Sequence, residues 1–129
     1  MKALIDSTVI LHLAHQRTKM INIIANNGIT ELLITRINYL EILAGASEDF
    51  KIGTRKSLQE FSILEFDKKA ADVGNTLAMK YRVGSKQSKD FLIACIAIAN
   101  KLPLLTENNK DFAYKQLNVL PYRINVAKL

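Results

Sequence analysis

The chain has 129 residues, a length typical of one domain, so we expect residues 1–129 to fold as a single unit. Apolar residues make up 49% of the chain, enough for one hydrophobic core, and the low numbers of Gly (5) and Pro (2) exclude collagen-like and low-complexity proteins. The formal net charge of +6 favours an anionic partner, either a nucleic acid or an acidic protein.

The sequence carries no disulfide framework and no membrane signal. The single cysteine, Cys95, cannot form an internal disulfide, and we expect it to be a small buried apolar residue. It lies in the longest apolar run, residues 91–99, which is too short to span a bilayer. Asp6 interrupts the apolar N-terminus, which argues against a signal peptide. We therefore expect a cytoplasmic protein without a membrane partner.

In the first half of the chain, short apolar segments alternate with helical patterns. Residues 2–5 predict a buried strand that ends at Asp6, and Ser7 or Thr8 is expected to cap the helix that follows. A second short helix then ends at the break formed by residues 26–28. The next expected elements are a strand over residues 31–35, a helix over residues 36–46 and a helix over residues 48–60.

The same alternation continues in the second half. A strand over residues 62–66 precedes a helix over residues 68–82, which Asp67 is expected to cap. A polar, basic loop then leads to a helix over residues 90–100, which is apolar nearly all round and must be buried. The remaining expected features are Ser88 as the N-cap of that helix, a strand over residues 103–106, a short helix capped by Asn108, and an edge strand in the tail, residues 118–126.

Strands that alternate with helices are typical of βαβ units, which build a parallel sheet with helices on both faces. We therefore predict the α/β class, with a three-layer α/β/α arrangement. Crossovers in such sheets are right-handed, and ligands bind beyond the carboxyl ends of the strands. Because Asp6 ends the first strand and Asp111 follows the fourth, we expect both side chains at the same edge of the sheet.

Four acidic residues stand next to strongly apolar segments: Asp6, Glu41, Asp90 and Asp111. Taken singly, each has a structural explanation, because Asp6 and Asp90 can start helices, Glu41 can be a solvated helix residue, and Asp111 can complete a capping box with Asn108. Acids seldom approach a core unless something compensates their charge. A carboxylate cluster on an otherwise basic chain points to a divalent metal site that faces a polyanion.

Other polar residues lie close to these acids in the sequence. Thr106, at a strand end, is placed to hydrogen-bond a ligated carboxylate or a water. Lys86 and Lys89 come just before Asp90, where they are either solvated surface or contacts for a substrate phosphate. Glu107 lies beside the predicted site, and its role stays open at this point.

Four segments in this order resemble the PIN-domain nucleases, in particular the VapC-type toxins of toxin–antitoxin pairs: LIDSTVIL, NYLEILAG, DFLIACIAIANKLPLLT and TENNKDF. Together they span nearly the whole chain. The resemblance implies a parallel sheet of four or five strands between helical layers. By this resemblance, the catalytic acids of the family correspond to Asp6, Glu41, Asp90 and Asp111. The three aspartates are expected to hold Mg²⁺ or Mn²⁺.

The resemblance also implies a function and partners. The function is a metal-dependent endoribonuclease, the toxin of a pair, which inhibits translation by cutting RNA. The partners are an RNA substrate, a cognate antitoxin and a second copy in a homodimer. The supporting hydrogen-bond shell is expected to comprise Ser7, Thr8, Thr106 and Asn108. The chain departs from the family where Asp-Thr-Asn is replaced by Asp6-Ser7-Thr8, and where Glu107 takes the place of a neutral or basic residue.

Three other functions compete with this interpretation. A non-catalytic PIN-like module could bind RNA or protein without cutting, although such a module would be expected to lack one of the four acids. A phosphoacceptor receiver domain would need an acceptor Asp at the end of a central strand, and the strand over residues 62–66 ends instead at Phe66. A nuclease that matures RNA or cuts DNA would share the same chemistry without a toxin role.

Overall fold

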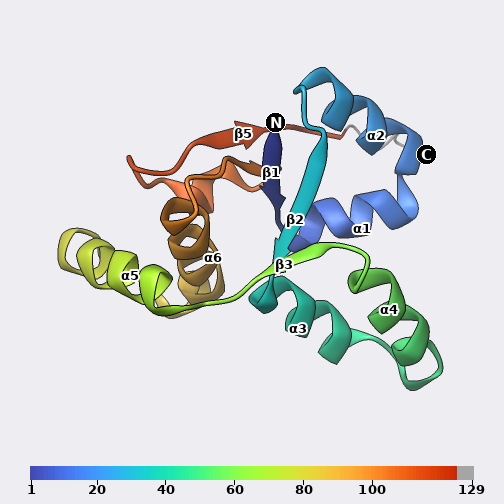
Figure 1. Ribbon diagram of the computed structural model, residues 1–129, viewed down its shortest axis with the longest axis horizontal. Helices are drawn as coiled ribbons and strands as arrows, with labels where there is room; N and C mark the ends of the chain where they lie inside the picture. Colours follow the sequence, from blue (N-terminus) through green and yellow to red (C-terminus); the bar gives the residue numbers. More distant parts are fainter. Residues whose placement is uncertain (125–129) are drawn as a thin grey trace.

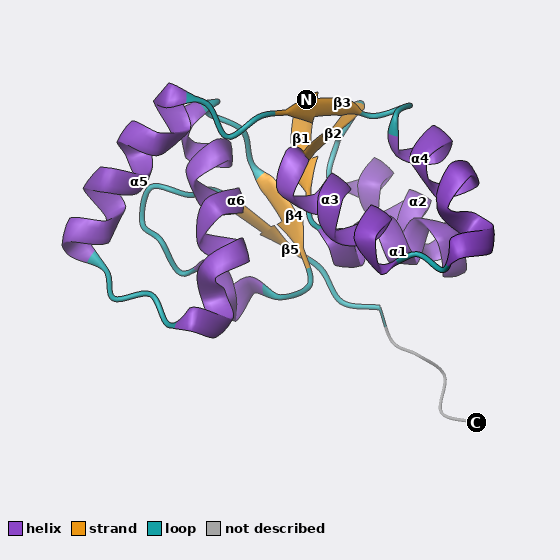
Figure 2. Cartoon of the chain, turned by 90° about the horizontal axis from the view of Figure 1, so that it is seen from below, coloured by secondary structure: helices purple, strands orange, loops and turns teal. Residues whose placement is uncertain are grey.

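The computed structural model describes residues 1–124 and contains a five-stranded, fully parallel sheet between two groups of helices (Figures 1 and 2). The strands are β1 (Lys2–Ile5), β2 (Glu31–Thr35), β3 (Ser62–Leu64), β4 (Leu104–Thr106) and β5 (Val119–Pro121). Their order across the sheet is β3-β2-β1-β4-β5, so β1 is central. The predicted α/β/α class with a parallel sheet is confirmed.

The helices cover both faces of the sheet. They are α1 (Ser7–His15), α2 (Arg17–Asn26), α3 (Arg36–Gly45), α4 (Lys51–Leu58), α5 (Lys68–Lys80) and α6 (Ser88–Ala99), with short 3-10 turns η1 (Glu48–Phe50), η2 (Ser85–Gln87) and η3 (Asn109–Phe112). Figure 2 shows α5 and α6 on one side of the sheet and α1 to α4 on the other. No helix within residues 1–124 has the length and apolar character needed to cross a bilayer.

Alternating side chains of each central strand enter two separate cores. In β1, Leu4 packs in the core beneath α5 and α6, whereas Ala3 and Ile5 pack in the core beneath α1 and α2. In β4, Leu104 and Leu105 divide between the two cores in the same way. Successive side chains of a strand point to opposite faces, so a sheet covered on both faces needs an uninterrupted apolar run. This requirement explains why these strands are apolar throughout.

The strand order creates the crevice where a site is expected. The connection after β1 leads to β2 on one side, whereas the connection after β4 leads to β5 on the other side. These two connections therefore diverge above the carboxyl ends of the neighbouring strands β1 and β4. Asp6 follows β1 directly, and Thr106 ends β4. The strand order also excludes the phosphoacceptor receiver domain, in which the third strand is central. In this protein β3 is an edge strand and ends at Leu64.

Two predicted helix caps are wrong. Asp6, not Ser7 or Thr8, is the N-cap of α1, and its carboxylate accepts a hydrogen bond from the backbone N–H of Val9. Helix α6 has its N-cap at Gln87, because the chain already turns through η2 before it, and Ser88 instead bonds back to the carbonyl of Ser85. The prediction that Asp67 caps α5 is confirmed.

Several predicted boundaries shift because tertiary contacts decide them. Helix α5 ends at Lys80 rather than at residue 82, since the ring of Tyr81 packs edge-on against Tyr114 with centroids 5.1 Å apart. The helix predicted over residues 48–60 divides into η1 and α4, and the ammonium of Lys51 at the junction donates to the carbonyl of Leu43 at the end of α3.

Two predicted strands also stop well short of their expected ends, and one predicted helix lacks its side-chain cap. Strand β3 stops at Leu64 because its partner β2 ends at Thr35, the residue that faces it. In the tail only Val119–Pro121 is a strand, and residues 125–126 of the predicted segment lie outside the described residues. Asn108 precedes η3 as predicted, but its side chain makes no capping bond.

Candidate active site

A cavity of about 990 Å³ opens at the carboxyl edge of the sheet, and its wall includes all four predicted acids. Asp6 enters it from the β1–α1 junction, Glu41 from α3, Asp90 from the first turn of α6 and Asp111 from η3. Segments far apart in sequence therefore meet at one place. Among the other predicted site residues, the cavity wall includes Ser7, Thr8, Asn108, Lys86 and Lys89. Thr106 is fully buried behind the wall.

Asp6 is held rigidly at the floor of this cavity. Its side chain is only 5% exposed, and its Oδ1 accepts from the backbone N–H of Val9 at 3.2 Å. Its Oδ2 accepts a hydrogen bond from the hydroxyl of Thr106 on the neighbouring strand β4, and that hydroxyl in turn accepts from the N–H of Asn108 at 3.0 Å. Burial raises the pKa of Asp6 above its usual value, although these hydrogen bonds act in the opposite direction.

Glu41 receives a donor on each of its carboxylate oxygens. The hydroxyl of Ser7 donates to Oε1, and the ammonium of Lys89 donates to Oε2. Partial burial acts to raise the pKa of Glu41, but the hydrogen bonds and charge of these two partners outweigh it and leave that pKa lowered. Glu41 is therefore an ionised carboxylate oriented by residues from two other helices.

Of the four acids, Asp90 has the surroundings that least favour its ionised form. Half-burial comes first among the causes, followed by the charges of Asp111, Asp6 and Glu41, and together they raise the pKa of Asp90 to about 6. Lys89 offsets only part of this effect. The carboxyl groups therefore interact electrostatically across the cavity, as a cluster of like charges does.

The chemistry of this donor set fits a divalent cation. Carboxylate oxygens are the hard ligands that Mg²⁺ and Mn²⁺ prefer, and they also neutralise the charge of the ion. As the side chains stand, no three His, Cys, Asp or Glu residues within residues 1–124 form a group that could hold a metal ion. Ligation by Asp6, Asp90 and Asp111 would therefore require the side chains of Asp90 and Asp111, which also line the cavity, to rotate toward the fixed carboxylate of Asp6.

The raised pKa of Asp90 predicts a pH-dependent stability for the metal-free protein. Between the usual value of 3.8 and about 6, folded Asp90 holds a proton that the unfolded chain releases. The stabilisation that this proton gives to the folded state is thus fully present below pH 3.8 and is lost as the pH rises through about 6. In EDTA at about pH 7.5, we expect Asp90→Asn to be more stable than the parent by on the order of 1 kcal/mol, after allowance for solvent screening.

Thermal unfolding followed by circular dichroism at two pH values checks this expectation. The advantage of Asp90→Asn should amount to a few degrees at about pH 7.5 and should shrink at about pH 4.5, where the parent carboxyl is protonated. The matched control is Asp49→Asn, because Asp49 is exposed and lies outside the cavity wall. A difference between Asp90→Asn and the parent that stayed the same at both pH values would contradict the predicted linkage.

Glu107 has a structural role that its sequence position did not reveal. Its Oε2 accepts from the backbone N–H of Ile124 at 2.9 Å, which fixes the segment after β5. The hydroxyl of Tyr122 in the same segment lies 2.7 Å from Nδ1 of His12 on α1. Burial raises the pKa of Tyr122, so its hydroxyl is neutral. Glu107 and Tyr122 thus hold the segment up to Ile124 in place beside α1, and Glu107 does not line the cavity.

Sequence reasoning missed Asn38, a fully buried polar residue whose amide also lines the cavity. Its side chain closes a capping box with Thr35 at the start of α3 and donates to the hydroxyl of Ser7 at 3.0 Å. The signal was present in the sequence, because a Thr at the end of a strand with Asn three residues later resembles the S/T-x-x-E/Q capping pattern. The contact with Ser7, thirty-one residues away, carries no such signal.

The fold and the site together define a three-layer α/β protein with an acidic cleft at the carboxyl edge of its sheet. The family model described as the PIN domain matches residues 3–116. The chain therefore belongs to the PIN-domain family of nucleases. A comparison with curated proteins found no match.

Solved structures similar to this chain include three bacterial complexes. A toxin–antitoxin complex from Klebsiella pneumoniae is 27% identical, with a TM-score of 0.74 over 95% of this chain and 99% of the other. VapBC2 from Rickettsia felis, bound to a promoter DNA fragment, is 19% identical, with a TM-score of 0.72 over 95% and 100%. VapBC-1 from nontypeable Haemophilus influenzae is 22% identical, with a TM-score of 0.72 over 94% and 98%. The likeness extends over nearly the whole chain.

Proposed function

We propose that this protein is a Mg²⁺- or Mn²⁺-dependent endoribonuclease that acts in the cytoplasm as the toxin of a toxin–antitoxin pair and inhibits translation by cutting RNA. The observation that carries the proposal is the meeting of four acids, from four separate elements, in one cavity of a PIN-family domain. The similarity to the Klebsiella pneumoniae toxin–antitoxin complex supports the toxin role.

In this proposal Asp6, Asp90 and Asp111 hold the divalent ion, directly or through water. When bound, such an ion stabilises negative charge on phosphoryl oxygens and lowers the pKa of a bound water. Thr106 keeps Asp6 aimed at the cavity through its hydrogen bond. Glu41, whose Oε1 accepts a hydrogen bond from Ser7, helps orient the attacking water.

Basic residues on the cavity wall support a polyanionic substrate. Lys86 and Lys89 line the cavity beside the acids, and both are exposed. Lysine ammonium groups there offset the negative field of the acids and attract backbone phosphates without reading sequence. Lys89 would exchange its partner Glu41 for a substrate phosphate, since surface ion pairs of this kind are weak. The net charge of +6 acts in the same direction over longer distances.

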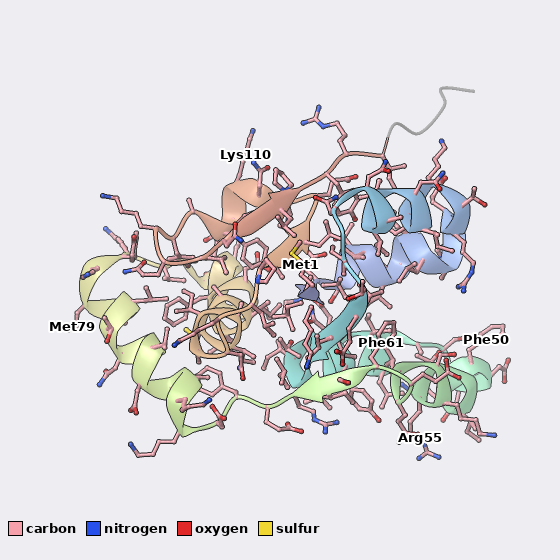
Figure 3. All side chains as sticks on the ribbon, turned by 45° about the horizontal axis from the view of Figure 1, so that its top comes forward. Met1, Phe50, Arg55, Phe61, Met79 and Lys110 are labelled. Atoms are coloured by element: carbon pink, nitrogen blue, oxygen red, sulfur yellow. The ribbon has the colours of Figure 1, made fainter. Side chains whose placement is uncertain are left out.

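The cavity has a second, apolar part that supports an antitoxin partner. Leu11 on α1 and Phe50 in η1 line it while remaining 49% and 69% exposed, and Phe50 stands at the outer end of the α3–α4 arm (Figure 3). Exposed apolar side chains that line one cavity offer a partner a surface to cover. A peptide segment seated there would also block the acids.

The homodimer stays a prediction. On α2, Ile23 and Ile24 pack against the core, whereas Ile21 is 45% exposed and is available to contact a second copy.

Incubation of the purified protein with RNA, with and without EDTA, tests the proposal. We expect cleavage in Mg²⁺ or Mn²⁺ and none in EDTA, with activity restored by excess metal. A parallel incubation with single-stranded and duplex DNA separates a ribonuclease from a DNA nuclease. RNA that is bound but left intact in every metal would contradict the proposal and favour the non-catalytic module.

A further inference from the structure

The buried amide of Asn38 is fixed in one orientation by donors that cannot reverse. Its Oδ1 accepts from the backbone N–H of Thr35 at 3.2 Å and from the hydroxyl of the same residue at 2.6 Å. A backbone N–H can only donate, so the oxygen of the amide must face Thr35. The amide nitrogen must therefore face the opposite way, toward Ser7, where Nδ2 lies 3.0 Å from the serine oxygen.

This orientation decides where the proton of Ser7 goes. A serine hydroxyl has one proton to donate and can accept hydrogen bonds on its oxygen. Because the Ser7 oxygen already accepts from Asn38, its proton is directed onward to Oε1 of Glu41. A single directed chain of hydrogen bonds thus runs from the buried start of α3, through Ser7 on α1, to a carboxylate on the cavity wall.

We propose that Asn38 is a positioning residue, which acts through the hydroxyl of Ser7 to hold the carboxylate of Glu41 in its working orientation. The inference rests on the proposed nuclease function for its consequence in catalysis, but the hydrogen-bond chain itself does not. Loss of a hydrogen-bonding partner that orients a metal ligand typically costs about 10- to 100-fold in metal affinity or activity, and we expect a loss of similar size for a partner that orients Glu41 beside the metal site.

Two substitutions break the chain at different links. Asn38→Asp is close in shape and keeps an acceptor for Thr35, but it cannot donate to Ser7 and draws the serine proton away from Glu41. Ser7→Ala removes the middle link and leaves the capping box of α3 untouched. If the buried charge of Asn38→Asp prevents folding, Ser7→Ala alone still tests the chain. Ser7→Thr, which retains a hydroxyl, is the conservative variant that should restore function.

Steady-state kinetics on an RNA substrate give the first readout. We expect each of Asn38→Asp and Ser7→Ala to lower kcat by about 10- to 100-fold while KM stays within about threefold. The double variant should be no slower than the slower single variant, because both changes break one chain. Parent-like kcat in either folded single variant, or losses that multiply in the double variant, would overturn the inference.

Carboxyl-carbon NMR of Glu41 gives a second readout that needs no cleavage. The Glu41 resonance is assigned by its disappearance in Glu41→Gln, and it should shift in Ser7→Ala and in Asn38→Asp and return in Ser7→Thr. A resonance that stayed in place in both single variants would overturn the inference even if RNA is cut. If the parent cuts no RNA while the resonance shifts as expected, the proposed function fails and the positioning role of Asn38 stands.

Discussion

Replacement of Asp90 by Asn is expected to reduce RNA cleavage by on the order of a thousand-fold while the fold is retained. Asp90 lines the cavity from the first turn of α6 and interacts electrostatically with the other three acids. Asparagine has nearly the same shape but loses the charge and one of the two ligand oxygens. Because the substitution also relieves repulsion, lost activity would coincide with a metal-free protein at least as stable as the parent.

Single-turnover cleavage of RNA in saturating Mn²⁺ measures this effect. The matched control is again Asp49→Asn, an exposed acid outside the cavity wall, which should cut at the parent rate. Circular dichroism of both variants establishes that they are folded. Cleavage by Asp90→Asn at the parent rate would show that the acids are assigned to the wrong role.

Added Mn²⁺ is expected to raise the melting temperature of the parent by several degrees. A ligand that binds only the folded state stabilises it by about 2.7 kcal/mol when its free concentration is 100 times its dissociation constant. Here the gain should be reinforced because the metal relieves the repulsion from Asp111, Asp6 and Glu41, which together with burial raises the pKa of Asp90. Scanning calorimetry or circular dichroism across a Mn²⁺ titration provides the measurement.

The same titration on variants identifies where the metal binds. The shift should vanish in Asp90→Asn and persist in Asp49→Asn. Equal shifts in Asp90→Asn and the parent would place metal binding elsewhere on the chain and remove the basis for metal-dependent cleavage at this site.

The layers of the fold could be predicted because they depend on local patterns. The segments around Leu4 and Leu104 are short and apolar throughout, as a sheet covered on both faces requires, and helices separate them. Boundaries were less predictable, because they depend on distant partners. Helix α5 ends where Tyr81 turns to meet Tyr114, and β3 ends where its neighbour β2 ends. Neither contact leaves a trace in the local sequence.

The candidate site likewise contains features that the sequence predicts and features that it does not. Asp6 and Asp111 could be predicted to share one edge, because the topology of a parallel sheet fixes where strands end. The partners of Glu41 could not, since Ser7 and Lys89 lie 34 and 48 residues away along the chain. Glu107 illustrates the reverse case, where an acid beside the site turned out to bind the backbone of Ile124.

The most direct test is anomalous X-ray diffraction from crystals grown with Mn²⁺. We expect an anomalous peak within coordination distance of the carboxylates of Asp6, Asp90 and Asp111, with the side chains of Asp90 and Asp111 rotated toward it. Crystals of Asp90→Asn grown in the same solution should lose that peak. A Mn²⁺ peak away from these acids, or the same peak retained in Asp90→Asn, would contradict the central claim that this cleft is a metal site.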